Sequence, residues 1–335
     1  MTELDNEIQS YVDTESVSTD EVKGIVKEFQ KNKTFEFPVC ILSHKFDKRR
    51  SKFLAKLELE IQNNNLSNHY YIFTYEDQKD LYRKFEAIHS KVHVIYVPLD
   101  KKYSTLTGKR QYILDWNIKE KHSNAFFIED DCFDFCLPVG KINPNTGNYK
   151  NYQFVMSFDF VFGFWECLVN KYDLKYSGPV NNMDFAFRDL RTTPFIKKYA
   201  QAIQAVHINI DSCKALNLFY DENSGWDDYD MILQQCIYNT GSAGIGFSYN
   251  TPSLKSGVSA MSASIDALKE RCIKNTTLLM NKWGSDLVRI DDKKGLYNAK
   301  VKWTTIKKAV ADKVPLKSLI HKTIPNIPTL EDFYE

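Results

Sequence analysis

Long apolar segments are missing from this sequence of 335 residues, and no stretch approaches the roughly 18 apolar residues that a membrane-spanning helix needs. The polar N-terminus also has no signal-peptide core, so we expect a soluble, unprocessed, cytoplasmic protein. Net charge is almost absent: 44 Lys and Arg face 43 Asp and Glu, which excludes a strong overall field for nucleic acid. No internal repeat or low-complexity run is present.

Cysteine patterns typical of zinc sites or disulfide frameworks are also missing. The seven cysteines are odd in number and scattered, and several lie in apolar runs as small buried residues do. Cys132 and Cys136 could begin a zinc site, but no second Cys/His pair follows at a suitable spacing. This cysteine usage fits a reducing cytoplasm.

Charge is unevenly distributed along the chain. We predict an acidic tail and a short docking helix over residues 1–34, a single large domain over 35–285, and a basic C-terminal extension over 286–335. The docking helix is predicted from the capping box formed by Ser18 and Glu21. The lysines near the end are Lys293, Lys294, Lys300, Lys302, Lys307, Lys308, Lys313, Lys317 and Lys322.

Apolar runs alternate with helix-prone segments through the first 130 residues, and this rhythm predicts an α/β fold with a doubly wound sheet. We expect strands at 37–42, 70–75, 92–97 and 125–128, and helices at 45–56, 81–89 and 111–121. Farther along, we expect a loop at 138–150, strands at 205–211 and 244–249, a polar loop at 251–262 and a helix at 264–283. Most aromatic rings of 151–220 are expected to be core, and so is His207.

Three acidic residues directly follow the apolar run Phe126–Ile128. Buried strands of α/β proteins place ligands at their carboxyl ends, so Glu129, Asp130 and Asp131 would lie at the mouth of a site. Glu129 and Asp131 could offer hard oxygen ligands to Mg²⁺ or Mn²⁺, ions that often also hold substrate phosphates. The alternative is a strand that ends in a solvated acidic turn.

Basic residues occur where two predicted helices begin. The first strand ends in Ser43 and leads into a basic segment with Arg49, which could hold an anion with amide groups and side chains. Arg110, in Gly108-Lys109-Arg110, precedes the acidic strand, where its cation could meet a phosphate or a base ring. For both, a solvated helix surface is the alternative reading.

A second acidic cluster follows Trp226. Asp227 and Asp228 would lie in the first turn of a helix over about 228–238, where the helix dipole favours negative charge. Capping explains one acid, whereas a carboxylate beside a Trp can be positioned to take a proton from an acceptor hydroxyl. The polar loop after the last strand could be a lid over a donor, and its Lys255 could reach a phosphate.

In this order, these motifs resemble those of the GT-A glycosyltransferases, whose acid-x-acid motif holds a divalent ion against the diphosphate of a nucleotide sugar. Among these, the chain looks most like the TET/JBP-associated glycosyltransferases of phages and kinetoplastids, which are linked to adding sugars to hydroxymethylated pyrimidines in DNA. The resemblance spans roughly residues 36–260 and consists of short motifs. Two positions depart from the family pattern: Glu129 stands where Asp is common, and Ser256-Gly257-Val258 only partly matches a later glycine pair.

The resemblance implies a GT-A, Rossmann-like, mixed and mainly parallel sheet flanked by helices, with helical appendages at both ends and 35–285 as the catalytic domain. It implies Glu129 and Asp131 as ligands of Mn²⁺ or Mg²⁺, and Asp228 as catalytic base with Asp227 beside it. It places a UDP-sugar donor near Ser43, Arg49, Arg110, Asp130, Trp226 and Lys255.

The function implied is metal-dependent transfer of a sugar from a UDP-sugar to a hydroxymethylated or hydroxylated pyrimidine in DNA, in a phage-encoded DNA hypermodification. The terminal lysines could grip DNA phosphates, or they could be a soluble tail. Three alternatives remain open: a GT-A enzyme with a protein or polysaccharide acceptor, a metal-dependent nuclease, and a non-catalytic DNA-binding module. The sugar, the metal, the oligomeric state and the stereochemistry, inverting or retaining, are left open.

Overall fold

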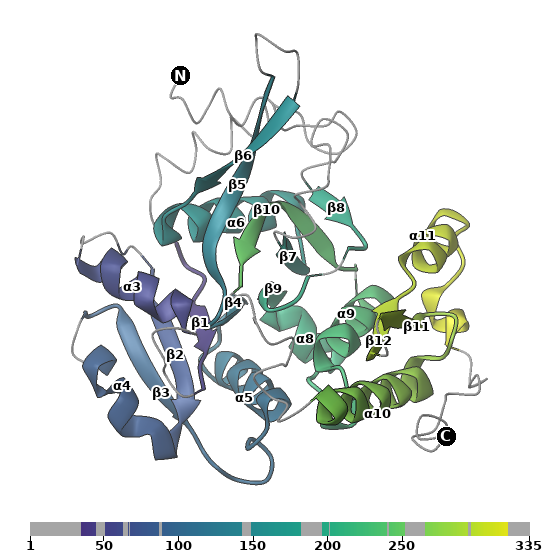
Figure 1. Cartoon of the computed structure of the whole chain (residues 1–335), viewed down its shortest axis with the longest axis horizontal. Helices are drawn as coiled ribbons and strands as arrows, with labels where there is room; N and C mark the ends of the chain where they lie inside the picture. Colours follow the sequence, from purple (N-terminus) through teal and green to yellow (C-terminus); the bar gives the residue numbers. More distant parts are fainter. Residues whose placement is uncertain are drawn as a thin grey trace. The chain divides into compact units, whose positions relative to one another are not determined.

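The computed structural model describes residues 35–44, 51–62, 66, 68–86, 89–142, 149–181, 196–200, 202–239, 241–251, 265–293 and 296–320 (Figure 1). The chain forms two compact units, the first made of Met1–Ala215 with Ser242–Pro252, and the second of Leu216–Gly241 with Ser253–Glu335. The chain therefore enters the second unit, returns to the first for one strand, and leaves again. The range 35–285, predicted as one domain, contains residues of both units.

One ten-stranded mixed sheet forms the first unit, in the order β3-β2-β1-β4-β9-β7-β10-β5-β6, with β8 paired to β10. The strands are β1 (Val39–Leu42), β2 (Tyr70–Tyr75), β3 (Val92–Val97), β4 (Asn124–Glu129), β5 (Phe133–Ile142), β6 (Tyr149–Val155), β7 (Tyr176–Asn181), β8 (Ile196–Lys198), β9 (Ala205–Asn209) and β10 (Ala243–Asn250). Parallel pairing joins β3, β2, β1 and β4, and also β7 with β10, while β9, β5 and β8 run antiparallel to their neighbours. The predicted mixed α/β sheet is confirmed.

Alternation along β1 explains how helices cover both faces of the sheet. Val39 and Ile41 belong to a core cluster with rings of α3 (Lys52–Gln62) and α6 (Phe158–Tyr172), such as Phe53 and Phe162. Cys40 points to the other face, where Asn117 of α5 (Leu106–Lys119) donates to its sulfur at 3.4 Å. Successive strand residues face opposite sides, so the continuous apolar runs read from the sequence are buried from both directions.

Helices separate the strands as predicted, with shifted ends. Besides α3, α5 and α6, the first unit contains η1 (Glu76–Gln78), α4 (Lys79–Glu86) and α8 (Ile210–Leu216), the last ending one residue beyond the boundary of the unit. Thr105 starts α5 earlier than expected, because its side chain accepts from Gly108 N at 2.9 Å. The strand predicted over 205–211 ends two residues earlier, at Asn209, because helix α8 begins at Ile210. His207 is fully buried in β9, as expected of a core histidine.

The loop predicted over 138–150 is wrong at both of its ends. Residues 138–142 continue β5 and residues 149–150 begin β6, which pair antiparallel. Pro138 and Gly140 are tolerated in β5 because its pairing with β10 lies near Phe133 and Cys136, so these later residues pair with β6. Residues 143–148 lie outside the described part.

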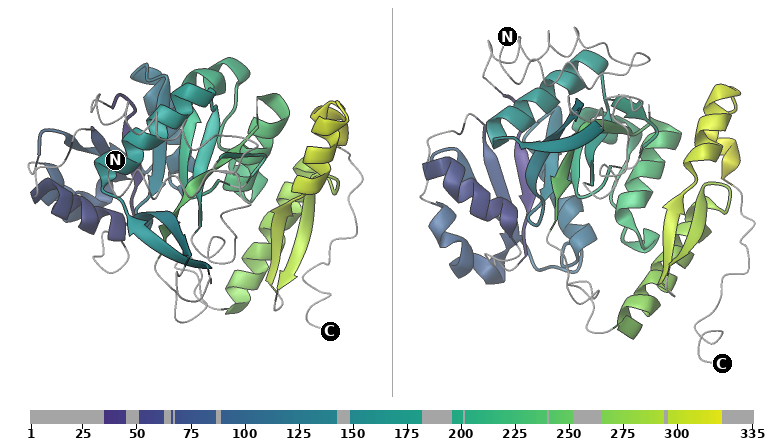
Figure 2. Two further views of the ribbon diagram at one scale, coloured as in Figure 1. Left: turned by 90° about the horizontal axis from the view of Figure 1, so that it is seen from above. Right: turned by 45° about the horizontal axis from the view of Figure 1, so that its top comes forward.

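The second unit contains η2 (Glu222–Ser224), α9 (Asp227–Tyr238), α10 (Ile265–Trp283), the hairpin β11 (Val288–Lys293) and β12 (Leu296–Val301), α11 (Trp303–Ala311) and η3 (Leu316–Leu319). The predicted helices at 228–238 and 264–283 are confirmed. The hairpin runs alongside α10 (Figure 2). Much of the basic segment over 286–335 is therefore folded into the same unit as α9.

Two expected elements lie outside the described residues, namely the acidic tail with its docking helix and nearly all of the loop over 251–262. Within the described part of the chain, no helix is both long and apolar enough to cross a membrane.

Candidate functional site

The carboxyl ends of β1 and β4 meet at one edge of the sheet. These strands are parallel neighbours with Leu42 opposite Glu129, so Ser43 and Asp130 emerge side by side. The amide of Asp130 donates to Leu42 O at 3.1 Å, and the amide of Phe53 in α3 donates to Asp130 O at 3.0 Å. The acidic turn is thus fixed by the backbone at the edge where α/β sheets bind ligands.

Asp130 is held by two hydroxyl groups. Ser43 Oγ donates a very short hydrogen bond to Asp130 Oδ2, and Ser51 Oγ donates to the same oxygen at 2.9 Å. Ser43 Oγ is also 2.6 Å from Tyr82 Oη. Burial raises the pKa of Asp130, although the two serines and Lys109 oppose the shift. Ser43 and Asp130, predicted as donor contacts, are therefore brought together.

Glu129 is paired with Arg110 across the edge of the sheet. Arg110 Nη2 forms a close ion pair with Glu129 Oε1, and both side chains are largely buried. Gln204 Nε2 donates to the other oxygen of Glu129 at 3.2 Å, and Tyr249 Oη lies 3.0 Å from Gln204 Oε1. Glu129, predicted as a metal ligand, and Arg110, predicted as a donor contact, thus bind each other.

Lys109 lies beneath this cluster, next to Arg110 in α5. Its Nζ donates to Ser43 O at 2.6 Å and lies 3.8 Å from the centroid of the Tyr75 ring. Burial lowers the pKa of Lys109 to about 7, while the charges of Asp130 and Asp77 act in the opposite direction. At neutral pH the amine of Lys109 is therefore only partly protonated, and it contacts the acidic turn through the carbonyl of Ser43.

Asp131 is the carboxylate of the cluster whose charge is least compensated. Burial and the charge of Asp130 raise the pKa of Asp131 to about 6, while contacts with its own amide, Cys132 and Arg110 act in the opposite direction. Its thiol neighbour Cys132 Sγ lies 3.9 Å from Asp131 Oδ1. Asp131 is partly buried and forms no ion pair with another described residue, so a bound cation would stabilise its carboxylate.

Both oxygens of Glu129 accept from neighbouring side chains, Oε1 from Arg110 and Oε2 from Gln204, so a divalent ion shared with Asp131 would use the remaining lone pairs of Glu129. Among the described residues, no group of three or more His, Cys, Asp or Glu could hold a metal ion. The residues present fit an ion with Asp131 as a protein ligand and other oxygens supplied by phosphates, as is common for Mg²⁺.

The second acidic cluster belongs to the second unit. Asp227 and Asp228 are half-buried in the first turn of α9, as predicted. Trp226 precedes them, and its Nε1 donates to Thr276 Oγ1 of α10 at 3.1 Å. The indole N–H of Trp226 is therefore bonded within the unit. The ring of Tyr229 lies edge-on to the Trp226 ring, with 6.4 Å between the ring centroids.

Arg49 and Lys255, the remaining predicted donor contacts, lie outside the described residues. Sequence reasoning missed three residues that the structure brings into the first cluster. Lys109 could have been found, since it shares the quoted Gly-Lys-Arg segment with Arg110. Ser51 and Gln204 carried no signal, because their roles depend on the turn and the sheet register.

Comparisons with known proteins complete this description. No protein-family model and no curated protein matches the chain. Among solved structures, the chain is similar to S. aureus TarS 1-349 in complex with UDP, with a TM-score of 0.41 and 9% sequence identity. The match covers 74% of this chain and 66% of that chain, which is just under two thirds of the TarS fragment. A likeness of this degree concerns the shape of the chain and does not assign an activity to it.

Proposed function

We propose that the protein is a glycosyltransferase that moves a sugar from a UDP-sugar to the hydroxyl of a hydroxymethylated or hydroxylated pyrimidine in DNA. The observation that carries the proposal is the cluster at the ends of β1 and β4, where Ser43 and the acidic turn after β4 meet the buried Lys109 and Arg110 of α5. Such a sheet edge suits a nucleoside diphosphate. The family resemblance of the motifs supplies the sugar and the DNA acceptor.

In the donor half of the reaction, Ser43 and Asp130 would contact the nucleotide, and Asp131 with Glu129, the two ligands that the resemblance implies, would hold Mn²⁺ or Mg²⁺. When bound, that ion would neutralise the negative charge that develops on the departing diphosphate. Arg110, with its orientation fixed by Glu129, would add positive charge on the same side. Arg49 and Lys255 remain proposed donor contacts from the resemblance alone.

In the acceptor half, Asp228 would take the proton of the attacking hydroxyl, with Asp227 beside it. This role assumes inversion at the sugar carbon, whereas with retention both carboxylates would orient groups. Support comes from their position in the first turn of α9, where helix dipoles favour the charged form of a carboxylate. Trp226 would contribute an apolar wall.

The DNA acceptor is supported by the charge of the C-terminal lysines. Lys302, Lys307, Lys313 and Lys317 belong to the described end of the second unit. Lysines that neutralise phosphates release counterions, so binding of this protein to DNA should weaken steeply with salt.

Mass analysis of nucleosides tests the proposal. Hydroxymethylated DNA is incubated with the protein, Mn²⁺ and a panel of sugar nucleotides, with unmodified DNA as the control. We expect a hexose or pentose mass on the modified pyrimidine only, and its loss in Asp131→Asn. Donor hydrolysis without a DNA product would indicate another acceptor, and DNA fragmentation in Mg²⁺ a nuclease. Absence of any donor turnover would overturn the enzyme assignment.

A further inference from the structure

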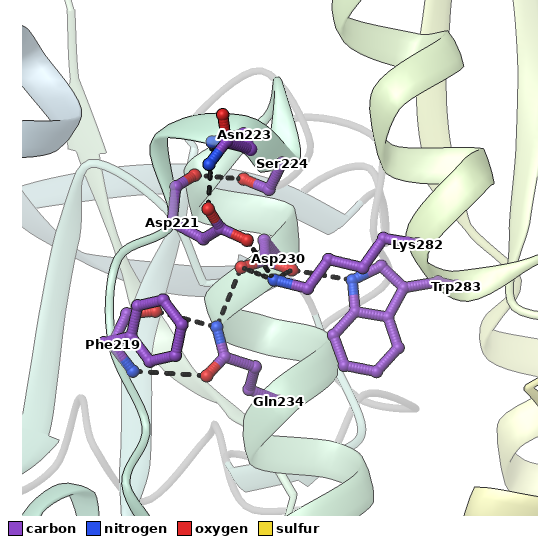
Figure 3. A network of polar contacts seen from close by, with 8 residues as sticks. All are labelled: Phe219, Asp221, Asn223, Ser224, Asp230, Gln234, Lys282 and Trp283. Atoms are coloured by element: carbon purple, nitrogen blue, oxygen red, sulfur yellow. Dashed lines mark hydrogen bonds and ion pairs between the residues drawn. The ribbon is translucent and has the colours of Figure 1, made fainter.

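Helix α10 is bonded to the first turn of α9 and to the segment before it by a network of ion pairs and hydrogen bonds within the second unit. Lys282 Nζ lies 2.7 Å from Asp221 Oδ2 and 2.9 Å from Asp230 Oδ1. Trp283 Nε1 donates to Asp230 Oδ1 at 2.7 Å, and the side chain of Asp230 is fully buried (Figure 3). Two consecutive residues of α10 thus hold one carboxylate in the first turn of α9.

The same carboxylate is tied to the segment that leads into α9. Gln234 Nε2 donates to Asp230 Oδ2 and to Phe219 O, both at 2.8 Å, while the amide of Phe219 donates to Gln234 Oε1 at 3.2 Å (Figure 3). Asp221 Oδ1 accepts from the amide of Asn223 at 2.9 Å and caps the N-terminus of η2. The path of the backbone from Phe219 to Asp230 is therefore fixed by side chains.

Close packing restricts this segment at a third point. Gly225 has a φ of +77°, and a Cβ there would lie 2.4 Å from Asn275 O of α10. The next residue, Trp226, bonds Thr276 Oγ1, which in turn donates to Tyr297 O at 2.9 Å. Only a residue without a side chain allows the backbone to approach α10 this closely.

We infer that Lys282, with Asp221 and Asp230 as its partners, is a positioning residue for the carboxylates Asp227 and Asp228. The inference rests on the proposed function, in which Asp228 accepts a proton from the acceptor hydroxyl. Lys282 touches neither carboxylate in the contacts described here and acts through Asp230, two residues beyond Asp228 in the same helical turn.

Stability alone gives a poor account of this network. Well-packed apolar residues of similar volume usually stabilise a protein as well as a buried ion pair does, because the charges lose their hydration. Apolar packing has no direction, however, whereas Lys282 and Trp283 restrain Asp230 through hydrogen bonds of fixed geometry. Burial acts against the charge of Lys282, but the carboxylates of Asp230 and Asp221 raise the pKa of Lys282; burial also raises the pKa of Asp230, a shift that Lys282, Trp283 and Gln234 oppose.

The test uses Asp221→Asn, which retains an oxygen for the amide of Asn223. It removes one of the two carboxylate partners of Lys282 and leaves Asp230 in place. Its matched control is Asp291→Asn, which removes the 2.8 Å ion pair with Lys300 in the hairpin of the same unit. Because Lys282→Met would leave Asp230 buried and unpaired and could unfold the unit, Lys282→Arg serves as the conservative variant.

The first readout is hydrogen exchange of the α9 amides from Asp230 to Gln234 in the full-length protein. We expect exchange about tenfold faster in Asp221→Asn, no change there in Asp291→Asn, and nearly wild-type exchange in Lys282→Arg. Equal exchange in Asp221→Asn and wild type would overturn the inference.

The second readout separates turnover from donor binding. We expect Asp221→Asn to lower kcat about tenfold while KM for the UDP-sugar stays within twofold of wild type. The conservative variant Lys282→Arg should retain most of the wild-type kcat. A matching loss in Asp291→Asn, or a change in donor KM alone, would contradict positioning. If the wild type transfers no sugar, the proposed function fails, and the exchange measurement still decides whether Lys282 fixes the start of α9.

Discussion

The guanidinium of Arg110 and the carboxylate of Glu129 form an ion pair between the first turns of α5 and the end of β4, where both side chains are mostly shielded from water. Removal of one partner leaves a buried, uncompensated charge, which costs more than the pair itself contributes. Glu129→Gln should therefore lower the free energy of unfolding by about 2–4 kcal/mol, as measured by urea denaturation.

A matched control for that prediction is Glu58→Gln, which breaks the more exposed ion pair between Lys84 and Glu58. Exposed ion pairs contribute about 0–1 kcal/mol, so this variant should stay within that range of wild type. A similar loss in both variants would contradict a special role of burial for the first pair.

Asp131→Asn should separate function from stability. The substitution removes a partly buried negative charge that has no ion-pair partner among the described residues, so the variant should be at least as stable as wild type in thermal denaturation. Transfer activity should fall about 100-fold or more, because an amide is a poor ligand for Mg²⁺ or Mn²⁺. Wild-type stabilisation by Mn²⁺ with UDP, absent in the variant, would complete the test. A fully active variant would exclude Asp131 as the metal ligand.

The burial of His207 leads us to predict how the free energy of unfolding depends on pH. Burial, helped by the charge of Lys175, lowers the pKa of His207 from 6.5 to about 3, and its Nε2 lies 3.0 Å from Asn124 Oδ1. Below pH 6.5 the unfolded chain binds a proton that the folded chain does not, so stability should fall as the pH drops from 6.5 towards 3. The slope from this residue is at most about 1.4 kcal/mol per pH unit.

His207→Gln retains a donor for Asn124 but does not titrate. Urea denaturation between pH 7 and pH 4 should therefore show a flatter loss of stability in the variant than in wild type. Identical slopes would show that His207 does not carry the acid sensitivity.

Gly225→Ala should destabilise the second unit. The added Cβ would meet the backbone of Asn275 and would also place a non-glycine residue at a positive φ. Together these effects should cost about 2–4 kcal/mol, as measured by urea denaturation. Lys274→Ala, at an exposed position next to Asn275, is the control and should change stability by less than about 0.5 kcal/mol.

Elements of the sheet were predictable where local pattern and tertiary environment agree. The runs at 70–75 and 92–97 are strands with these bounds; the apolar run of β2 is largely buried, while the edge strand β3 keeps four partly exposed residues between buried ends. The β5-β6 hairpin was missed because its Pro and Gly residues are typical of turns, and pairing far along the chain decides whether they can be extended. Propensity gives way to tertiary context at such positions.

Candidate residues were easier to find than their relationships. The acids after β4 and those that begin α9 were evident from charge beside apolar runs. That Glu129 binds Arg110 could not be predicted, because residues 110 and 129 approach only through the register of β4 and the position of α5. The role of Lys282 was hidden for the same reason, since it lies 52 positions from Asp230.

The division of the chain into units has a consequence for synthesis on the ribosome. All strands of the first unit are translated once Asn250 has been added, so this sheet can close early. Helix α9, made before the last strand of that sheet, has only its own Gln234 to pair with the buried Asp230 until Lys282 and Trp283 of α10 follow. Nascent chains stalled so that Asn250 has left the ribosome while Lys282 is still inside it should therefore already protect the sheet from proteases while α9 is open to cleavage.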